Sequence, residues 1–219
     1  VNTNPFPLHY FIENKGQFNS NSEFSAAPDF ELNDKDCDIQ IFKNGFSCVA
    51  GSKQISQIFT NTNPNATIIV EGKTQHYFSY GLAKLNAYGY ASVTIQNLYP
   101  NIDIRYEVHP EIASGFKYSI ILKKGSNISD ISWKITGDDS STWSSTAKTT
   151  IISKHLIINQ TEWKVYDEIG TPVSLRFIRE YDTVKLQIQS YKLHEAYNID
   201  PWVYTITNMD TLKYTKYPF

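Results

Sequence analysis

The sequence predicts an all-β protein, mainly antiparallel and sandwich-like, with two pseudo-lobes. Three observations support this. The 219 residues include 15 Tyr, 12 Phe and 4 Trp, and aromatic residues, with the abundant Ile, Thr and Val, favour strands. Turn signals recur at intervals of roughly 8–12 residues, a spacing typical of sandwiches and barrels. No segment shows the periodicity of a long amphipathic helix.

Composition also limits the classes of partner. The net charge is −2 with both signs interspersed, so the chain lacks the basic surface that duplex nucleic acid requires. No apolar run approaches the roughly 20 residues needed to span a bilayer. We therefore expect no nucleic-acid partner and no membrane insertion. The chain begins at Val1 without a signal-peptide pattern, which indicates a mature form or an excised segment.

In the first half, alternating or apolar runs between turn clusters predict short strands. They cover residues 24–32, 39–42, 46–50, 55–59, 67–70, 76–80, 91–97 and 102–108. Pro28 interrupts the first of these strands, and proline is confined to edge positions in sheets. Residues 82–90, punctuated by Gly and Asn, are expected to form a loop.

In the second half the same reasoning predicts further strands. They cover residues 116–122, 131–136, 150–152, 156–158, 163–166, 172–179 and 183–190. A Ser/Thr-rich loop is expected at 138–149, and a short helical turn near 127–131 with Ser126 or Asn127 as its cap. We expect one all-β domain over residues 1–203, with a weak internal boundary near 109–115. Residues 204–219 are then a C-terminal extension or the start of another module.

Residues 99–106, Tyr-Pro-Asn-Ile-Asp-Ile-Arg-Tyr, join the two halves. The Pro100-Asn101 turn starts a strand, in which side chains alternate between faces. We expect its apolar face in the core: Ile102, Ile104 and Tyr106. Asp103 is expected to be satisfied by neighbours of Arg105 or by backbone amides.

Two cysteines, Cys37 and Cys48, flank the hairpin signal Asn44-Gly45. A regular hairpin that pairs Ile41 with Cys48 would place the two thiols on one face, roughly 13 Å apart. That exceeds the Cα separation of about 7 Å that a disulfide tolerates. Two small buried residues are one interpretation, and a disulfide through a looser loop is the other.

Few residue patterns suggest chemistry. Asp34, Asp36 and Asp38 have the alternating spacing of a calcium loop, but its glycine and bidentate glutamate are missing. A solvated acidic turn is the alternative. The five histidines are not spaced for zinc: His9, His76, His109, His155 and His194. We therefore expect no metal site and no cofactor.

No nucleophile elbow, phosphate-binding loop or dinucleotide fingerprint occurs. Carboxylate pairs such as Asp103 with Glu107, or Asp167 with Glu168, are available to a hydrolase, which needs two carboxyls at a fixed separation. Any soluble protein offers such pairs. Enzymatic activity is therefore not the expected function.

Tryptophan can stack on a sugar ring where it is exposed. Trp133 and Trp163 sit in apolar runs and are expected in the core. Trp143 differs, because its neighbours are Ser and Thr. Trp143 is the candidate ligand-contacting residue, and the alternative is that its loop covers a sheet end.

Several short sequence motifs, called phrases below, follow one another along the chain. They are Phe11-Ile-Glu-Asn-Lys-Gly-Gln17, Leu98-Tyr-Pro-Asn-Ile-Asp-Ile-Arg-Tyr106, Phe116-Lys-Tyr118 with Lys124-Gly125, Val165-Tyr-Asp-Glu168 and Ile199-Asp-Pro201. This order resembles the uncharacterised N-terminal domain of secreted and surface proteins, many from Bacteroidota. That domain often precedes SBBP β-propeller repeats, PKD-type domains or a type IX secretion sorting domain. The resemblance covers residues 11–202. Three positions depart from this pattern. The family favours an acidic residue at the position of Ser119, Gly at the position of Asn101 and a Pro-containing segment at the position of Trp163.

The resemblance implies a secreted or cell-surface location and a module within a longer chain. It carries over no activity and no catalytic residue. We expect a non-enzymatic extracellular module with a structural, adhesive or partner-binding role, in contact with other domains of its chain or with surface proteins. The alternative is a carbohydrate-binding module that uses exposed aromatic residues, and a hydrolase is the third reading.

Overall fold

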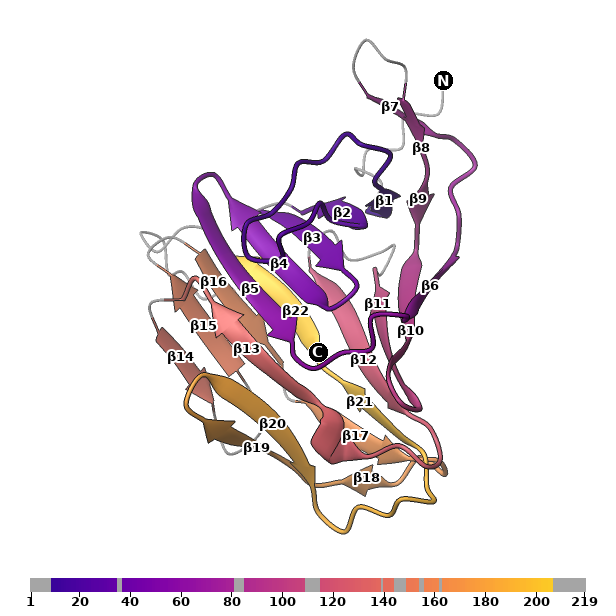
Figure 1. Ribbon diagram of the computed structural model, residues 1–219, viewed down its shortest axis with the longest axis vertical. Helices are drawn as coiled ribbons and strands as arrows, with labels where there is room; N and C mark the ends of the chain where they lie inside the picture. The colour runs from indigo at the N-terminus through magenta and orange to yellow at the C-terminus, as the bar shows by residue number, and fades with distance from the viewer. Residues whose placement is uncertain are drawn as a thin grey trace, which may run out of the picture.

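Two large antiparallel sheets pack face to face in the structure, a computed structural model (Figure 1). It describes residues 9–34, 37–80, 85–108, 115–138, 140–143, 149–153, 156–161 and 163–206. Neither sheet closes into a barrel, and no α-helix occurs in these ranges. The predicted all-β, antiparallel, sandwich-like fold is confirmed.

The first sheet has nine strands. In spatial order they are β19 (Leu175–Glu180), β20 (Thr183–Ile188), β13 (Ser132–Thr136), β5 (Lys53–Phe59), β4 (Gly45–Ala50), β3 (Asp38–Phe42), β2 (Phe30–Asn33), β1 (Phe11–Glu13) and β9 (Gly89–Tyr90).

The second sheet has eleven strands. Its main path is β14 (Ser140–Trp143), β15 (Thr149–Ser153), β16 (Leu156–Gln160), β22 (Trp202–Ile206), β12 (Phe116–Leu122), β11 (Ile102–Glu107), β10 (Ser92–Tyr99) and β6 (Thr67–Glu71). Beside β12 lies β21 (Tyr197–Asp200), which pairs with β17 (Lys164–Asp167), and β17 pairs with β18 (Pro172–Val173). A separate hairpin of β7 (Phe78–Tyr80) and β8 (Leu85–Ala87) projects from the body (Figure 1).

Strands from both sides of residues 109–115 lie in both sheets. The first sheet combines β1 to β5 with β13, β19 and β20, and in the second β11 pairs directly with β12. The buried apolar residues form one cluster that draws on both sheets. The predicted domain limits, at residues 203 and 109–115, stay a prediction.

Alternation decides which side chains enter this core. In β20 the residues Val184, Leu186 and Ile188 are buried, and Gln187 between them is exposed, as the pattern predicts. The central strand β11 buries its apolar face completely, with Ile102, Ile104 and Tyr106 at 0% exposure.

Aromatic rings from the two sheets meet in the middle of the sandwich. Phe46 of β4 contacts the rings of Tyr106, Phe116 and Tyr118, with centroids 6.4, 5.1 and 5.8 Å away. Such tilted and edge-on contacts contribute beyond the area they bury. They fix β4 against β11 and β12.

A chain of buried hydrogen bonds also crosses between the sheets. Gln57 of β5 donates from Nε2 to Tyr118 Oη of β12 at 3.1 Å, and Gln160 of β16 donates to Gln57 Oε1 at 2.9 Å. Trp163 Nε1 donates to Gln160 Oε1 at 3.2 Å. Since a buried polar group without a partner is costly, this chain holds the two sheets in one relative position.

The hairpin of β3 and β4 corrects one prediction. Its turn uses only Lys43 and Asn44, so Ile39 lies opposite Cys48 and the predicted pairing of Ile41 with Cys48 is wrong. Gly45 sets this register, because a Cβ there would lie 2.1 Å from the backbone oxygen of Gln57. Only glycine therefore fits so close to β5.

The shifted register brings the two cysteines together. Cys37 lies two residues from Ile39, which is a diagonal position relative to Cys48. Both cysteines are buried and no disulfide joins them, as the first interpretation predicts. The expected separation of roughly 13 Å is wrong, because the Cys48 thiol lies close enough to donate a hydrogen bond to Cys37. This hydrogen bond, together with burial, raises the pKa of Cys48.

Other expectations differ at polar segments. The loop expected at 82–90 contains β8 and β9, and the loop expected at 138–149 begins with β14. Each of these strands pairs along an edge, where burial on a core face is not required. The helical turn is present as a 3₁₀ turn, Ile128–Asp130, capped by Asn127. No helix in the described ranges is long and apolar enough to span a bilayer.

Replacing each of two core tyrosines with phenylalanine tests how much the buried hydrogen bonds between the sheets contribute to stability. Tyr118→Phe removes the acceptor of Gln57 and is expected to lower the free energy of unfolding by about 1–2 kcal/mol. Tyr106 Oη is buried without a hydrogen-bond partner among the described residues, so Tyr106→Phe is expected to be neutral or stabilising. Urea denaturation measures both, and equal losses in the two variants would contradict this assignment.

Stability is also expected to fall at high pH. Burial raises the pKa of Tyr99, Tyr106 and Tyr118. In the unfolded chain these phenols ionise at about pH 10, so the native state keeps its full advantage below that pH and loses it as the pH rises towards the raised pKa values. Denaturation at increasing pH is expected to show this loss, by about 1.4 kcal/mol per pH unit for each such group. Tyr118→Phe is expected to flatten the slope, whereas Tyr181→Phe, whose ring is 99% exposed, leaves it unchanged.

Candidate functional site

Trp143, the candidate ligand-contacting residue, is the last residue of β14 and lies opposite Thr149 in the ladder. Its side chain lies outside the described part of the chain. Its exposure and its contact with a ligand therefore stay a prediction. Two of the other tryptophans are in the core as predicted: Trp133 and Trp163 are 0% and 3% exposed, and their ring centroids stack 5.5 Å apart.

The acidic segment at 34–38 has a structural role at two of its three aspartates. Asp34 is 5% exposed and its Oδ2 accepts a hydrogen bond from the amide of Gly115 at 3.0 Å. Asp38 accepts from Asn33 Nδ2 across the β2–β3 hairpin at 2.8 Å. The expected solvated turn is therefore wrong for Asp34, and Asp36 lies outside the described residues.

Metal ligands do not gather in the described ranges, where no three His, Cys, Asp or Glu side chains could hold an ion together. His9 Nε2 lies 2.8 Å from the backbone oxygen of Gly115. His76 and His194 are exposed. His109 and His155 fall outside the described part of the chain.

The paired carboxylates contact neighbouring groups of the fold. Asp103 accepts from the amide of Asn97 at 2.9 Å and pairs with Lys123 at 2.7 Å, so the expected backbone partner is confirmed. Glu107 pairs with Arg105 at 3.0 Å.

The second carboxylate pair is engaged in the same way. Asp167 Oδ1 accepts from the amides of Ile169 and Thr171, which closes the β17–β18 turn. Glu168 pairs with Lys124 at 2.9 Å. In both pairs the carboxylates orient turns and strands.

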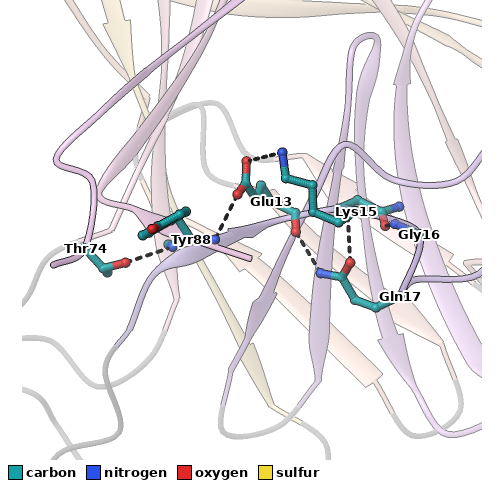
Figure 2. A network of polar contacts seen from close by, with 8 residues as sticks. Glu13, Lys15, Gly16, Gln17, Thr74 and Tyr88 are labelled. Atoms are coloured by element: carbon teal, nitrogen blue, oxygen red, sulfur yellow. Dashed lines mark hydrogen bonds and ion pairs between the residues drawn. The ribbon is translucent and has the colours of Figure 1, made fainter. Parts of the chain in front are cut away.

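Figure 2 shows a network of polar contacts between the segment at residues 11–17 and the residues Thr74 and Tyr88. Glu13 ends β1, where its amide donates to the backbone oxygen of Tyr88 at 2.9 Å. Its Oε1 accepts from the amide of Tyr88 at 2.9 Å, and its Oε2 pairs with Lys15 at 3.1 Å. The Glu13 carboxylate thus accepts a hydrogen bond from the Tyr88 amide, which has no backbone acceptor in β1 because the strand ends there.

The rest of this phrase folds back on itself. Asn14 Oδ1 accepts from the amide of Gly16 at 2.8 Å, an Asx turn, and Asn14 Nδ2 donates to the oxygen of Pro28 at 2.7 Å. Gln17 Nε2 donates to the oxygen of Glu13 at 2.7 Å and its Oε1 accepts from the amide of Lys15 at 2.6 Å. Residues 13–17, here called the clamp, therefore connect β1 to the segment before β2 and to Tyr88, the residue before β9.

Sequence reasoning missed one surface feature. Tyr181 lies in the two-residue turn between β19 and β20, and its side chain is 99% exposed. Beside it lies an open hollow of about 500 Å³ whose lining is otherwise polar. The available signal was an aromatic residue between Glu180 and Asp182, in a turn where small or polar residues are usual.

Variants of the clamp are expected to differ in a defined order. Glu13→Ala leaves the amide of Tyr88 without its acceptor and is expected to cost about 1–2 kcal/mol in the free energy of unfolding. Glu13→Gln retains an acceptor oxygen and costs less. Lys15→Ala removes an exposed ion pair and is expected to cost at most about 0.5 kcal/mol. Urea denaturation and hydrogen exchange of the Tyr88 amide test this order, which fails if Lys15→Ala is as damaging as Glu13→Ala.

A comparison with known protein families matches the same part of the chain as the sequence motifs described above. A family described as Domain of unknown function (DUF7948) matches residues 11–202. No curated protein and no solved structure matches the chain. Because the match covers most of the 219 residues, the chain belongs to the DUF7948 family.

Proposed function

We propose that the chain is a non-enzymatic module of a larger secreted or cell-surface bacterial protein, with a structural, adhesive or partner-binding role. The observation that carries the proposal is the use of its polar groups. The family phrase at residues 11–17 forms a clamp, and the carboxylates of Asp103, Glu107 and Asp167 hold strands or turns. The contacts of these groups are accounted for by strands and turns, which supports a structural role for them.

The setting of the proposal follows from the resemblance described above. Such a domain stands ahead of further modules, including SBBP repeats, PKD-type domains or a type IX sorting domain, in Bacteroidota. Secretion and gliding motility are the wider context. Other domains of the same chain and surface proteins are the expected partners.

Carbohydrate binding is the second candidate function, and one observation favours it. The exposed ring of Tyr181 stands beside a polar hollow. An aromatic face next to hydrogen-bonding groups can take a sugar ring without any reaction, so this role is a special case of the partner-binding module.

Two measurements test the proposal. The purified 219-residue chain is incubated with panels of glycosides, esters and peptides, and no product is expected above that of a heat-unfolded sample. Protease treatment of intact cells that produce the full-length protein is expected to remove this domain. Product release in proportion to the amount of folded protein would show an enzyme, and protection from protease in cells and culture medium would place the domain elsewhere.

A further inference from the structure

The two-residue turn between β19 and β20 requires a positive φ at its first residue, a position usually taken by glycine or asparagine, and here it holds a tyrosine. Tyr181 has a φ of 56°, in the left-handed region that glycine tolerates and bulky residues avoid. Its ring is 99% exposed, so no packing compensates for this conformation. An exposed aromatic residue in a disfavoured conformation indicates a role outside the fold.

The hollow beside this ring lies where three neighbouring strands of the first sheet come together. Lys134 of β13 is opposite Thr183 of β20, and β13 also pairs with β5, which leads into Thr60 and Asn61. The register thus places the turn, the end of β5 and β13 around one open space of about 500 Å³. Pockets for small ligands fall in this size range.

The lining combines hydrogen-bonding groups with balanced charge. Lys134 pairs with Asp182, and Lys185 pairs with Glu180, each at 2.7 Å. Because each cation has a carboxylate beside it, the hollow does not favour an anion such as a phosphate. The side-chain amide of Asn61 has no hydrogen-bond partner among the described residues and is exposed.

This combination matches the surface of a neutral sugar. The C–H face of a pyranose packs on an aromatic ring, and its hydroxyls donate to carboxylates and accept from ammonium and amide groups. The two ion pairs offer both kinds of partner, whereas an apolar ligand would leave them desolvated. The open shape suits one unit of a longer chain better than a fully enclosed small molecule.

We propose that the hollow beside Tyr181 binds a neutral sugar unit of a glycan, with Tyr181 as the stacking platform and Asn61 as a hydrogen-bonding residue. This inference rests on the proposed function, of which it names the ligand class. In this site the aromatic contact is Tyr181 and not Trp143.

A glycan array with the full chain tests the inference, using short neutral oligomers of glucose, xylose, mannose, galactose and N-acetylglucosamine. At least one is expected to bind. Titration calorimetry with that oligomer is expected to show binding weakened about tenfold or more in Tyr181→Ala, a loss typical of removing one aromatic stacking partner. Tyr181→Phe retains the ring and is expected to bind nearly as well, and Asn61→Ala is expected to bind more weakly.

The matched control is Tyr77→Ala, since Tyr77 is also exposed, at 53%, but lies next to β7 at the opposite end of the molecule (Figure 1). It is expected to leave binding unchanged. Tyr181→Gly removes the ring at a position that suits glycine, so it is expected to fold at least as stably as the parent while it loses binding. This variant separates loss of contact from loss of folding.

The inference is overturned if no neutral oligomer binds, or if binding persists in Tyr181→Ala and Tyr181→Gly. It is also overturned if these oligomers fail and a protein partner binds through Tyr181 instead. None of these results affects the proposed non-enzymatic role. Release of product from a bound oligomer would contradict that role and leave the sugar site in place.

Discussion

The buried hydrogen bonds from Trp163 through Gln160 and Gln57 to Tyr118 constrain the whole sandwich. Apolar side chains alone would let two flat sheets slide over one another with little change in buried area. A donor and an acceptor in the core allow only one alignment, because any shift leaves them without partners and without water. Aromatic contacts around Phe46 then fill the space that this alignment defines. The positions of the outer turns, including the turn that carries Tyr181, follow from this alignment of the two sheets.

The phrases that mark the family are explained by structure. Asn101 has a φ of 61°, a conformation that both Asn and Gly adopt, so Asn fits this turn as glycine would. Ser119 donates to Asp200, which also pairs with Lys117; an acidic residue at 119 would place a second carboxylate beside Asp200. Trp163 gives the polar chain its last donor. All three residues are thus accounted for by local contacts or by local backbone conformation.

The sequence predicts most of the fold because alternation and turn residues act locally. Strand β12 has the predicted bounds, and β20 has the predicted buried face. Local patterns do not specify which strands become neighbours, so the pairings of β13 with β5 and of β22 with β12 could not be foreseen. The Cys37–Cys48 contact was missed because it depends on a two-residue turn and on Gly45 fitting against β5. The surface at Tyr181 was missed because exposure is set by partners that lie far apart in the sequence.

The position of β22 has a consequence for how the chain is made. This strand, Trp202–Ile206, lies between β16 and β12 in the interior of the second sheet, although it is the last strand in the described sequence. Until it has been synthesised, β16 and β12 both present open edges, and the two parts of that sheet have no direct link through the main path. Loop closure over such sequence separations is slow compared with local pairing. The second sheet of the nascent domain therefore stays incomplete until residues 202–206 have been synthesised, and its early strands must wait for a partner that comes late in the chain.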